Sequence, residues 1–126
     1  MAETPITVTS STRYAAGEDP TATAGDAAND HTLQIVGYPM CLVCVNSNEA
    51  DVDFQFDLPA SKNTWNLVRT ISHTIPGADG GANGVRVVWI DTPDSITDDG
   101  VLNISSTDVN FGDVRFYAIA GTRTPR

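Results

Sequence analysis

Two cysteines in one apolar stretch, Cys41 and Cys44, have the C-x-x-C spacing of redox disulfides and zinc half-sites. The stretch MCLVCV is typical of an extended strand, in which residues three apart point to opposite faces with Cα atoms about 10 Å apart. A disulfide needs Cα atoms within about 7 Å, and one zinc ion cannot reach both faces of a strand. Because no second C-x-x-C pair exists in the sequence, we expect two buried, unreactive thiols and no bound metal.

Acidic residues form two groups whose carboxylates could hold a hard cation such as calcium. The groups are a stripe along ADVDFQFDL, made of Asp51, Asp53 and Asp57, and a loop cluster, made of Asp94, Asp98 and Asp99. A calcium loop brings its ligands together by turning sharply, whereas the stripe lies along an extended strand. For the stripe we expect a solvated face, with a charged partner contact and a calcium site as alternatives. For the loop cluster an ordinary polar turn and a calcium site both stay open.

Residue types used in phosphate binding or hydrolysis are present, but the sequence motifs that normally surround them in such sites are absent. GADGGANG is rich in glycine, but a P-loop would end in Gly-Lys-Ser/Thr and open a helix, whereas here Val85 opens a predicted strand. We expect these glycines to supply positive φ angles in a long hairpin. Only His31, in a polar segment, and His73, after a strand end, could act as a histidine base, and no G-x-S-x-G motif occurs. We therefore expect no enzyme, no catalytic residue and no cofactor.

Aromatic side chains leave a carbohydrate-binding module open as an alternative function, because sugars stack on exposed aromatic rings. Trp89 belongs to the apolar run VRVVWI and is expected in the core. Trp65 lies between Asn63 and Asn66 and is the better candidate for an exposed ring.

The composition is that of a chain made of strands. Valine, isoleucine and threonine number 35 of the 126 residues, while leucine, lysine, glutamate and glutamine number 11, which favours strands over helices. Strict alternation in ADVDFQFDL predicts a strand with a buried face, made of Val52, Phe54, Phe56 and Leu58. Further strands are expected at ITVT, LQIVGY, MCLVCV, WNLVRTI, VRVVWI (a central strand), GVLNIS and VRFYAIA. We predict an all-β fold, a single antiparallel β-sandwich of jelly-roll or immunoglobulin-like kind, with an extended N-terminal arm and a C-terminal tail.

One domain is expected, with a polar N-terminal strand and arm over 1–32, a sandwich core over 33–121 and a basic tail over 122–126. The formal net charge is −9, which makes free nucleic acid and anionic membranes poor partners. No apolar run is long enough to cross a membrane, and the N-terminus lacks the features of a signal peptide. No acidic residue follows Asp113, so the basic tail is expected either to be solvated or to dock on an acidic neighbouring protein.

The order of these segments resembles the small β-domain proteins that coat tailed-bacteriophage capsids as decoration or cement proteins. The matching parts are ITVT, the arm PTATAGDAANDH, the turn NSNEAD before VDFQF, the turn IPGADGG and the last strand VRFYAIA. The resemblance implies a virion structural protein, made in the host cytoplasm, that binds the outer surface of an assembled head and stabilises it. Its partners would be the major capsid protein and further copies of itself, as a trimer or other homo-oligomer. Another virion β-module, from a tail, neck or fibre, is the alternative.

Contacts with such a shell are expected chiefly from the two ends of the chain, because these can extend over neighbouring subunits. The residues predicted to bind a partner are Ile6, Val8, Trp65, Arg115, Arg123 and Arg126. No residue is expected to bind a metal or a cofactor.

Overall fold

A computed structural model of the chain describes residues 4–12, 20–26, 28–36, 40–58, 69–90 and 100–122. Within these residues the regular elements are ten strands and one short 3₁₀ turn, and no α-helix occurs. In chain order they are β1 (Thr4–Pro5), β2 (Val8–Thr12), β3 (Thr23–Ala24), β4 (His31–Gln34), β5 (Met40–Asn46), β6 (Val52–Leu58), β7 (Arg69–Ile75), β8 (Gly84–Ile90), β9 (Val101–Ser105), η3 (Phe111–Asp113) and β10 (Val114–Thr122). The predicted all-β class is confirmed. Nothing in the described ranges forms a helix with the length and apolar character needed to cross a bilayer.

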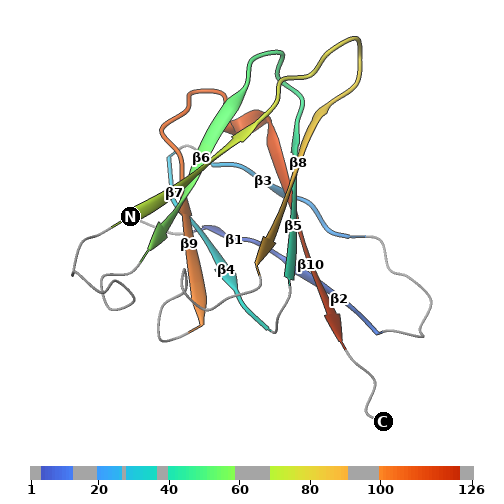
Figure 1. The fold of residues 1–126 in the computed structure, drawn as a ribbon, viewed down its shortest axis with the longest axis vertical. Helices are drawn as coiled ribbons and strands as arrows, with labels where there is room; N and C mark the ends of the chain where they lie inside the picture. Colours follow the sequence, from blue (N-terminus) through green and yellow to red (C-terminus); the bar gives the residue numbers. More distant parts are fainter. Residues whose placement is uncertain are drawn as a thin grey trace.

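The strands form two sheets. Sheet A has the order β1-β4-β9-β6-β7, and sheet B has the order β2-β10-β5-β8 with β3 also paired to β10. Figure 1 shows β6, β7, β9 and β4 of sheet A toward the left of the view and β8, β5 and β10 of sheet B toward the right. The prediction of purely antiparallel sheets is wrong, because β1 pairs with β4, and β2 with β10, in parallel. Both exceptions are N-terminal strands, and each pairs with a strand that follows much later in the chain.

In the segment 1–32, predicted to be a polar strand and an extended arm, the structure describes β1, β2, β3 and the start of β4, each of which belongs to one of the two sheets. The Thr4 amide donates to the Asp30 carbonyl at 2.9 Å, and the Gly25 amide donates to the Val114 carbonyl at 2.9 Å. The chain passes from sheet A to sheet B between β1 and β2, and Ile6 at this crossing is only 4% exposed. Backbone pairing and burial therefore hold the described parts of this segment in place. Of the predicted basic tail, Thr122 ends β10 and residues 123–126 lie outside the described residues.

One hydrophobic core lies between the two sheets. Val52, Phe54 and Phe56 of β6 are buried, as their alternation predicts. The ring of Phe54 in sheet A lies 5.5 Å, between centroids, from the ring of Phe116 in sheet B. The two sheets thus pack face to face through their aromatic side chains.

The last strand of sheet A and the edge strand of sheet B differ from expectation. The strand predicted at WNLVRTI is found at Arg69–Ile75, and its first residues, 65–68, lie outside the described residues. The apolar run VRVVWI, predicted to be central, forms β8, which among the described strands pairs only with β5 and ends sheet B. Trp89, expected in the core, is 64% exposed. The run is apolar on both faces although only one of them meets the core.

The glycine-rich loop carries the chain from β7 in sheet A to β8 in sheet B, and it arches over the top of the view in Figure 1. Asp79 and Ala82 bond to each other across a two-residue turn, in which Gly80 and Gly81 have φ angles of 59° and 84°. The prediction of positive φ angles at these glycines is confirmed. The strands on either side belong to different sheets, so the loop does not close a simple hairpin.

Candidate functional site

The outward side of sheet B is apolar. Along β5 the buried residues alternate with half-buried ones that point away from the core, namely Cys41, Val43 and Val45. Strand pairing places each of these between one residue of β8 and one of β10. The three rows so formed are called the apolar face below and consist of Trp89–Cys41–Ile119, Val87–Val43–Tyr117 and Val85–Val45–Arg115.

The apolar face is open to solvent mainly along β8. Trp89, Val85 and Val87 are 64%, 50% and 47% exposed. The side chains from β5, together with Tyr117 and Ile119 of β10, are half-buried. Arg115 is the one charged residue among the nine, and its guanidinium donates to the carbonyls of Gly112 and Val114 at 2.9 and 3.1 Å.

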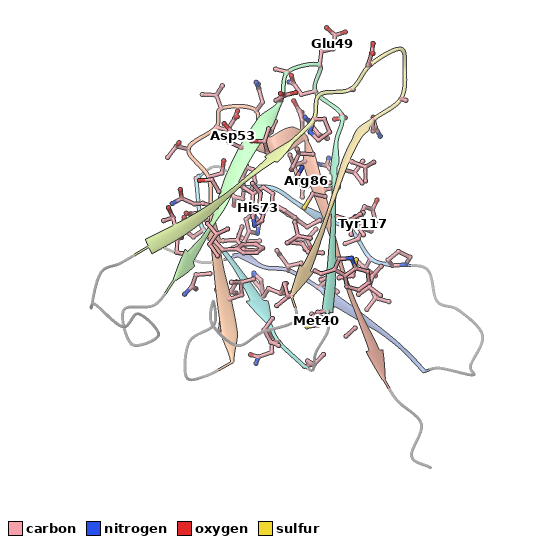
Figure 2. All side chains as sticks on the ribbon, in the orientation of Figure 1. Met40, Glu49, Asp53, His73, Arg86 and Tyr117 are labelled. Carbon is pink, nitrogen blue, oxygen red and sulfur yellow. The ribbon has the colours of Figure 1, made fainter. Side chains whose placement is uncertain are left out.

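The outward side of sheet A has the opposite character. The Asp53 carboxylate accepts a hydrogen bond from the Thr74 hydroxyl at 2.6 Å. The Asp57 carboxylate accepts one from the Ser105 hydroxyl at 2.7 Å and one from the Gln55 amide at 3.0 Å. Asp53 lies to the left, by β6, and Tyr117 to the right, beyond β5, in Figure 2. The stripe of carboxylates therefore belongs to a polar face, on which the carboxylates accept hydrogen bonds from hydroxyl and amide side chains.

The structure forms no candidate metal centre in the part of the chain that it describes, because no three His, Cys, Asp or Glu residues gather there. Hydroxyl groups from the neighbouring strands β7 and β9 donate hydrogen bonds to the carboxylates of Asp53 and Asp57, and the Gln55 amide of the same strand donates a further one to Asp57. The loop cluster of Asp94, Asp98 and Asp99 lies outside the described residues.

The two cysteines lie on opposite faces of β5, as predicted. Cys44 points into the core, and burial raises the pKa of its thiol to about 12. Cys41 lies on the apolar face between Trp89 and Ile119, and partial burial raises the pKa of its thiol as well. The expectation of two buried thiols therefore needs correction for Cys41, which is partly exposed.

Both histidines belong to strands, against expectation. His31 begins β4 and is fully buried, while His73 lies in the middle of β7. The His73 ring stacks on Phe54 at 5.2 Å, and its buried Nε2 has no hydrogen-bond partner among the described residues. Burial lowers the pKa of both imidazoles. The alternation of His31 with buried Leu33 could have predicted that His31 lies on the buried face of a strand.

Of the residues predicted to bind a partner, some are buried or half-buried, one is exposed, and the others lie outside the described residues. Ile6 is buried, and Val8 packs against the core half-buried, so neither offers a broad contact surface. Arg115 is exposed and lies on the apolar face. Trp65, Arg123 and Arg126 lie outside the described residues and stay predictions.

Sequence reasoning missed most of the apolar face. The available signal was the run VRVVWI, whose apolar residues occupy both faces of a strand. Such a run arises either when both faces are covered within one chain or when one face is left for a partner.

Comparison of the chain with protein-family models, curated proteins and solved structures finds no match.

Proposed function

We propose that this chain is a virion structural protein, a capsid decoration protein that docks through its apolar face on the outer surface of an assembled protein shell. The observation that carries the proposal is the contrast between the two outward faces, one apolar and one polar. Contiguous exposed apolar surface of this kind marks interaction sites in proteins. The shell as the docking partner comes from the resemblance of the segment order to phage decoration proteins. A sandwich of jelly-roll or immunoglobulin-like connectivity is part of the same proposal.

The chemistry of the apolar face suits docking on a folded protein. Tyr117 and Trp89 supply the large aromatic side chains that anchor protein interfaces. Arg115 at the end of the face would add a charge-assisted hydrogen bond to a shell carboxylate. The polar face of sheet A, which includes Asp53 and Asp57, would remain toward solvent and keep the decorated particle soluble.

The basic end of the chain is a second expected contact in this proposal. Arg123 and Arg126 would pair with acidic groups of the shell, while the rest of the chain carries the excess of acid. Contacts of this kind weaken as salt screens the charges, whereas apolar contacts at the face do not. Binding to the shell should therefore fall only in part as the salt concentration rises.

The decisive experiment mixes the purified chain with undecorated particles of the virus that encodes it. Co-sedimentation measures occupancy, and heating measures the stability of the shell. A ligand that binds only the intact shell stabilises it by about 2.7 kcal/mol at 100 times the dissociation constant. We expect full-length protein to bind and to raise the temperature at which the particles disrupt.

A matched pair of variants separates the two faces. Val43→Lys places a charge at the centre of the apolar face, and Ser72→Lys places the same charge on the exposed outward side of β7. We expect Val43→Lys to abolish occupancy and Ser72→Lys to retain it. If both variants bind like wild type, the apolar face is not the docking surface. If wild-type protein binds no particle and is missing from the outer surface of the native virion, the shell is not the partner.

A carbohydrate-binding module is the second candidate, because exposed Trp89 and half-buried Tyr117 lie on one sheet face. Sugar recognition also needs several hydrogen-bonding groups around the rings, and the apolar face offers few. A glycan array that detects binding lost on Trp89→Ala would favour this function. Electron microscopy of native particles would separate a head protein from a tail, neck or fibre module.

A further inference from the structure

We infer that two copies of this chain pair through their β8 strands, antiparallel and about a two-fold axis at Val87, so that the two B sheets become one. This interface uses the edge of sheet B, whereas docking on a shell uses the face of the same sheet. The inference goes beyond the proposed function and does not depend on it.

The β8 edge has only one of the usual protections against pairing, the exposed charge of Arg86. All seven residues of β8 pair with β5 on one side, and no described strand pairs with the other side. Exposed edges in soluble proteins are normally short, bulged, charged, interrupted by proline or covered. β8 is seven residues long and unbroken, contains no proline, and exposes Val85, Val87 and Trp89. Such an edge is a template for another strand.

The other edges of the two sheets fit this role less well. β1 and β3 have two residues each. β2, the other edge of sheet B, has five residues with the largely polar sequence VTSST. β7, which ends sheet A, turns Thr70, Ser72 and Thr74 outward and so has a polar outward side. A long edge with exposed apolar side chains is therefore a property of β8 among the described strands.

The sequence of β8 is complementary to itself in one register, which is the argument for a second copy as the partner. With Val87 on the axis, Val85 of each copy lies opposite Trp89 of the other, and Arg86 lies opposite Val88. This register pairs the whole strand. Moving the axis to Arg86 pairs only 84–88 and sets the two guanidinium groups against each other, which destabilises a strand pair. Moving it to Val88 pairs only 86–90.

The local charge at this edge permits self-association. Each chain has a formal net charge of −9, so two copies repel each other at long range. β8 contains no acidic residue, and its one charged side chain, Arg86, avoids its own copy in the register centred on Val87. Pairing should therefore become tighter as salt screens the net repulsion. This dependence is opposite in sign to that of contacts made by the basic tail.

Pairing at the edge would also extend the apolar face. Residues opposite each other in an antiparallel pair point to the same side of the sheet. The apolar faces of the two copies would therefore lie side by side, with Trp89 of one copy beside Val85 of the other. A dimer would offer a shell one uninterrupted apolar surface, twice as wide as that of a single chain.

Cysteine cross-linking tests both the pairing and its register. Directly opposite residues of antiparallel strands have Cα atoms about 4.5 or 5.5 Å apart, within the range that a disulfide spans. The variant Val87→Cys, in a Cys41→Ser background, should form a covalent dimer under mild oxidation by copper phenanthroline and oxygen. Val85→Cys in the same background is the matched control, because its two copies would lie roughly 14 Å apart along the strands. The remaining thiol, Cys44, is buried.

Sedimentation velocity of the unmodified chain, without any capsid present, completes the test. We expect a dimer whose dissociation constant falls as salt rises, and a monomer for Val87→Lys, which sets two like charges opposite each other. Val87 is 47% exposed, and urea unfolding should show that Val87→Lys remains folded. A wild-type monomer at millimolar concentration overturns the inference. Cross-linking of Val85→Cys as fast as Val87→Cys overturns the register. Neither result depends on whether the chain binds a shell.

Discussion

Replacing His31 by phenylalanine tests whether this buried ring holds the N-terminal strand to the core. The ring lies 5.6 and 5.7 Å, between centroids, from those of Phe111 and Phe116. Its Nδ1 is 3.0 Å from the Thr4 carbonyl, and its Nε2 is 2.9 Å from the Asp26 amide. A carbonyl only accepts and an amide N–H only donates, so the proton must be on Nδ1. His31 is therefore neutral, in one tautomer, and joins β1 to the turn before β4.

The expected cost follows from these two hydrogen bonds. Phenylalanine keeps a ring between the two aromatic neighbours but leaves the Thr4 carbonyl and the Asp26 amide without their partner. Each buried polar group left unpaired costs about 1–3 kcal/mol. Because both bonds are only part-buried, we expect a loss of about 2–4 kcal/mol for His31→Phe.

His73→Phe is the matched control, because the buried Nε2 of His73 has no partner in the part of the chain that the structure describes. No described hydrogen bond is lost in this variant, so its free energy of unfolding should change by less than about 1 kcal/mol or increase. Urea unfolding at pH 8, followed by tryptophan fluorescence, gives the free energy and the m value for both variants. If His31→Phe costs no more than His73→Phe, the hydrogen bonds of His31 do not stabilise the fold.

The same pair of variants predicts how stability depends on pH. Burial, the largest cause, lowers the pKa of His31 and of His73, and Arg86 lowers that of His73 further. In the unfolded chain both imidazoles titrate near their ordinary pKa of about 6.5. Below that pH the unfolded state binds more protons, so stability is full above about pH 6.5 and is lost as the pH falls toward the lower folded pKa. The combined His31→Phe and His73→Phe variant should lose less stability than wild type between pH 7 and 5.

Three further predictions concern the core, the glycine that begins β8 and the thiols. Phe54→Ala should lower the free energy of unfolding by about 3–5 kcal/mol in urea titrations, because the ring is 2% exposed and contacts both sheets. Gly84→Ala should destabilise by about 1–3 kcal/mol, since its Cβ would run into the Pro76 carbonyl, whereas Gly112→Ala, with nothing within 4 Å, should be neutral in thermal melts. A thiol reagent should modify Cys41 in the native protein but Cys44 only after unfolding, and equal rates would contradict the burial of Cys44.

The sequence by itself determined the class of fold and the strands whose signal is local. Alternation along ADVDFQFDL predicted the buried side of β6 and its polar outward side, because successive side chains of a strand point to opposite faces whatever that strand pairs with. The same rule placed Cys41 and Cys44 on opposite faces. The positive φ angles of Gly80 and Gly81 were also predictable, because tight turns favour glycine for local steric reasons.

Only the tertiary structure decided which strand is an edge and which residues face a partner. VRVVWI has the same composition whether a second layer of the chain or nothing covers its outward side, so its place at the edge of sheet B depends on residues far away in sequence. The parallel pairing of β1 and β2 depends likewise on β4 and β10. The burial of His31 depends on Phe111 and Phe116, which pack on it from the other end of the chain. Pairing and burial are long-range properties, whereas the alternation of side chains is set by the geometry of each strand.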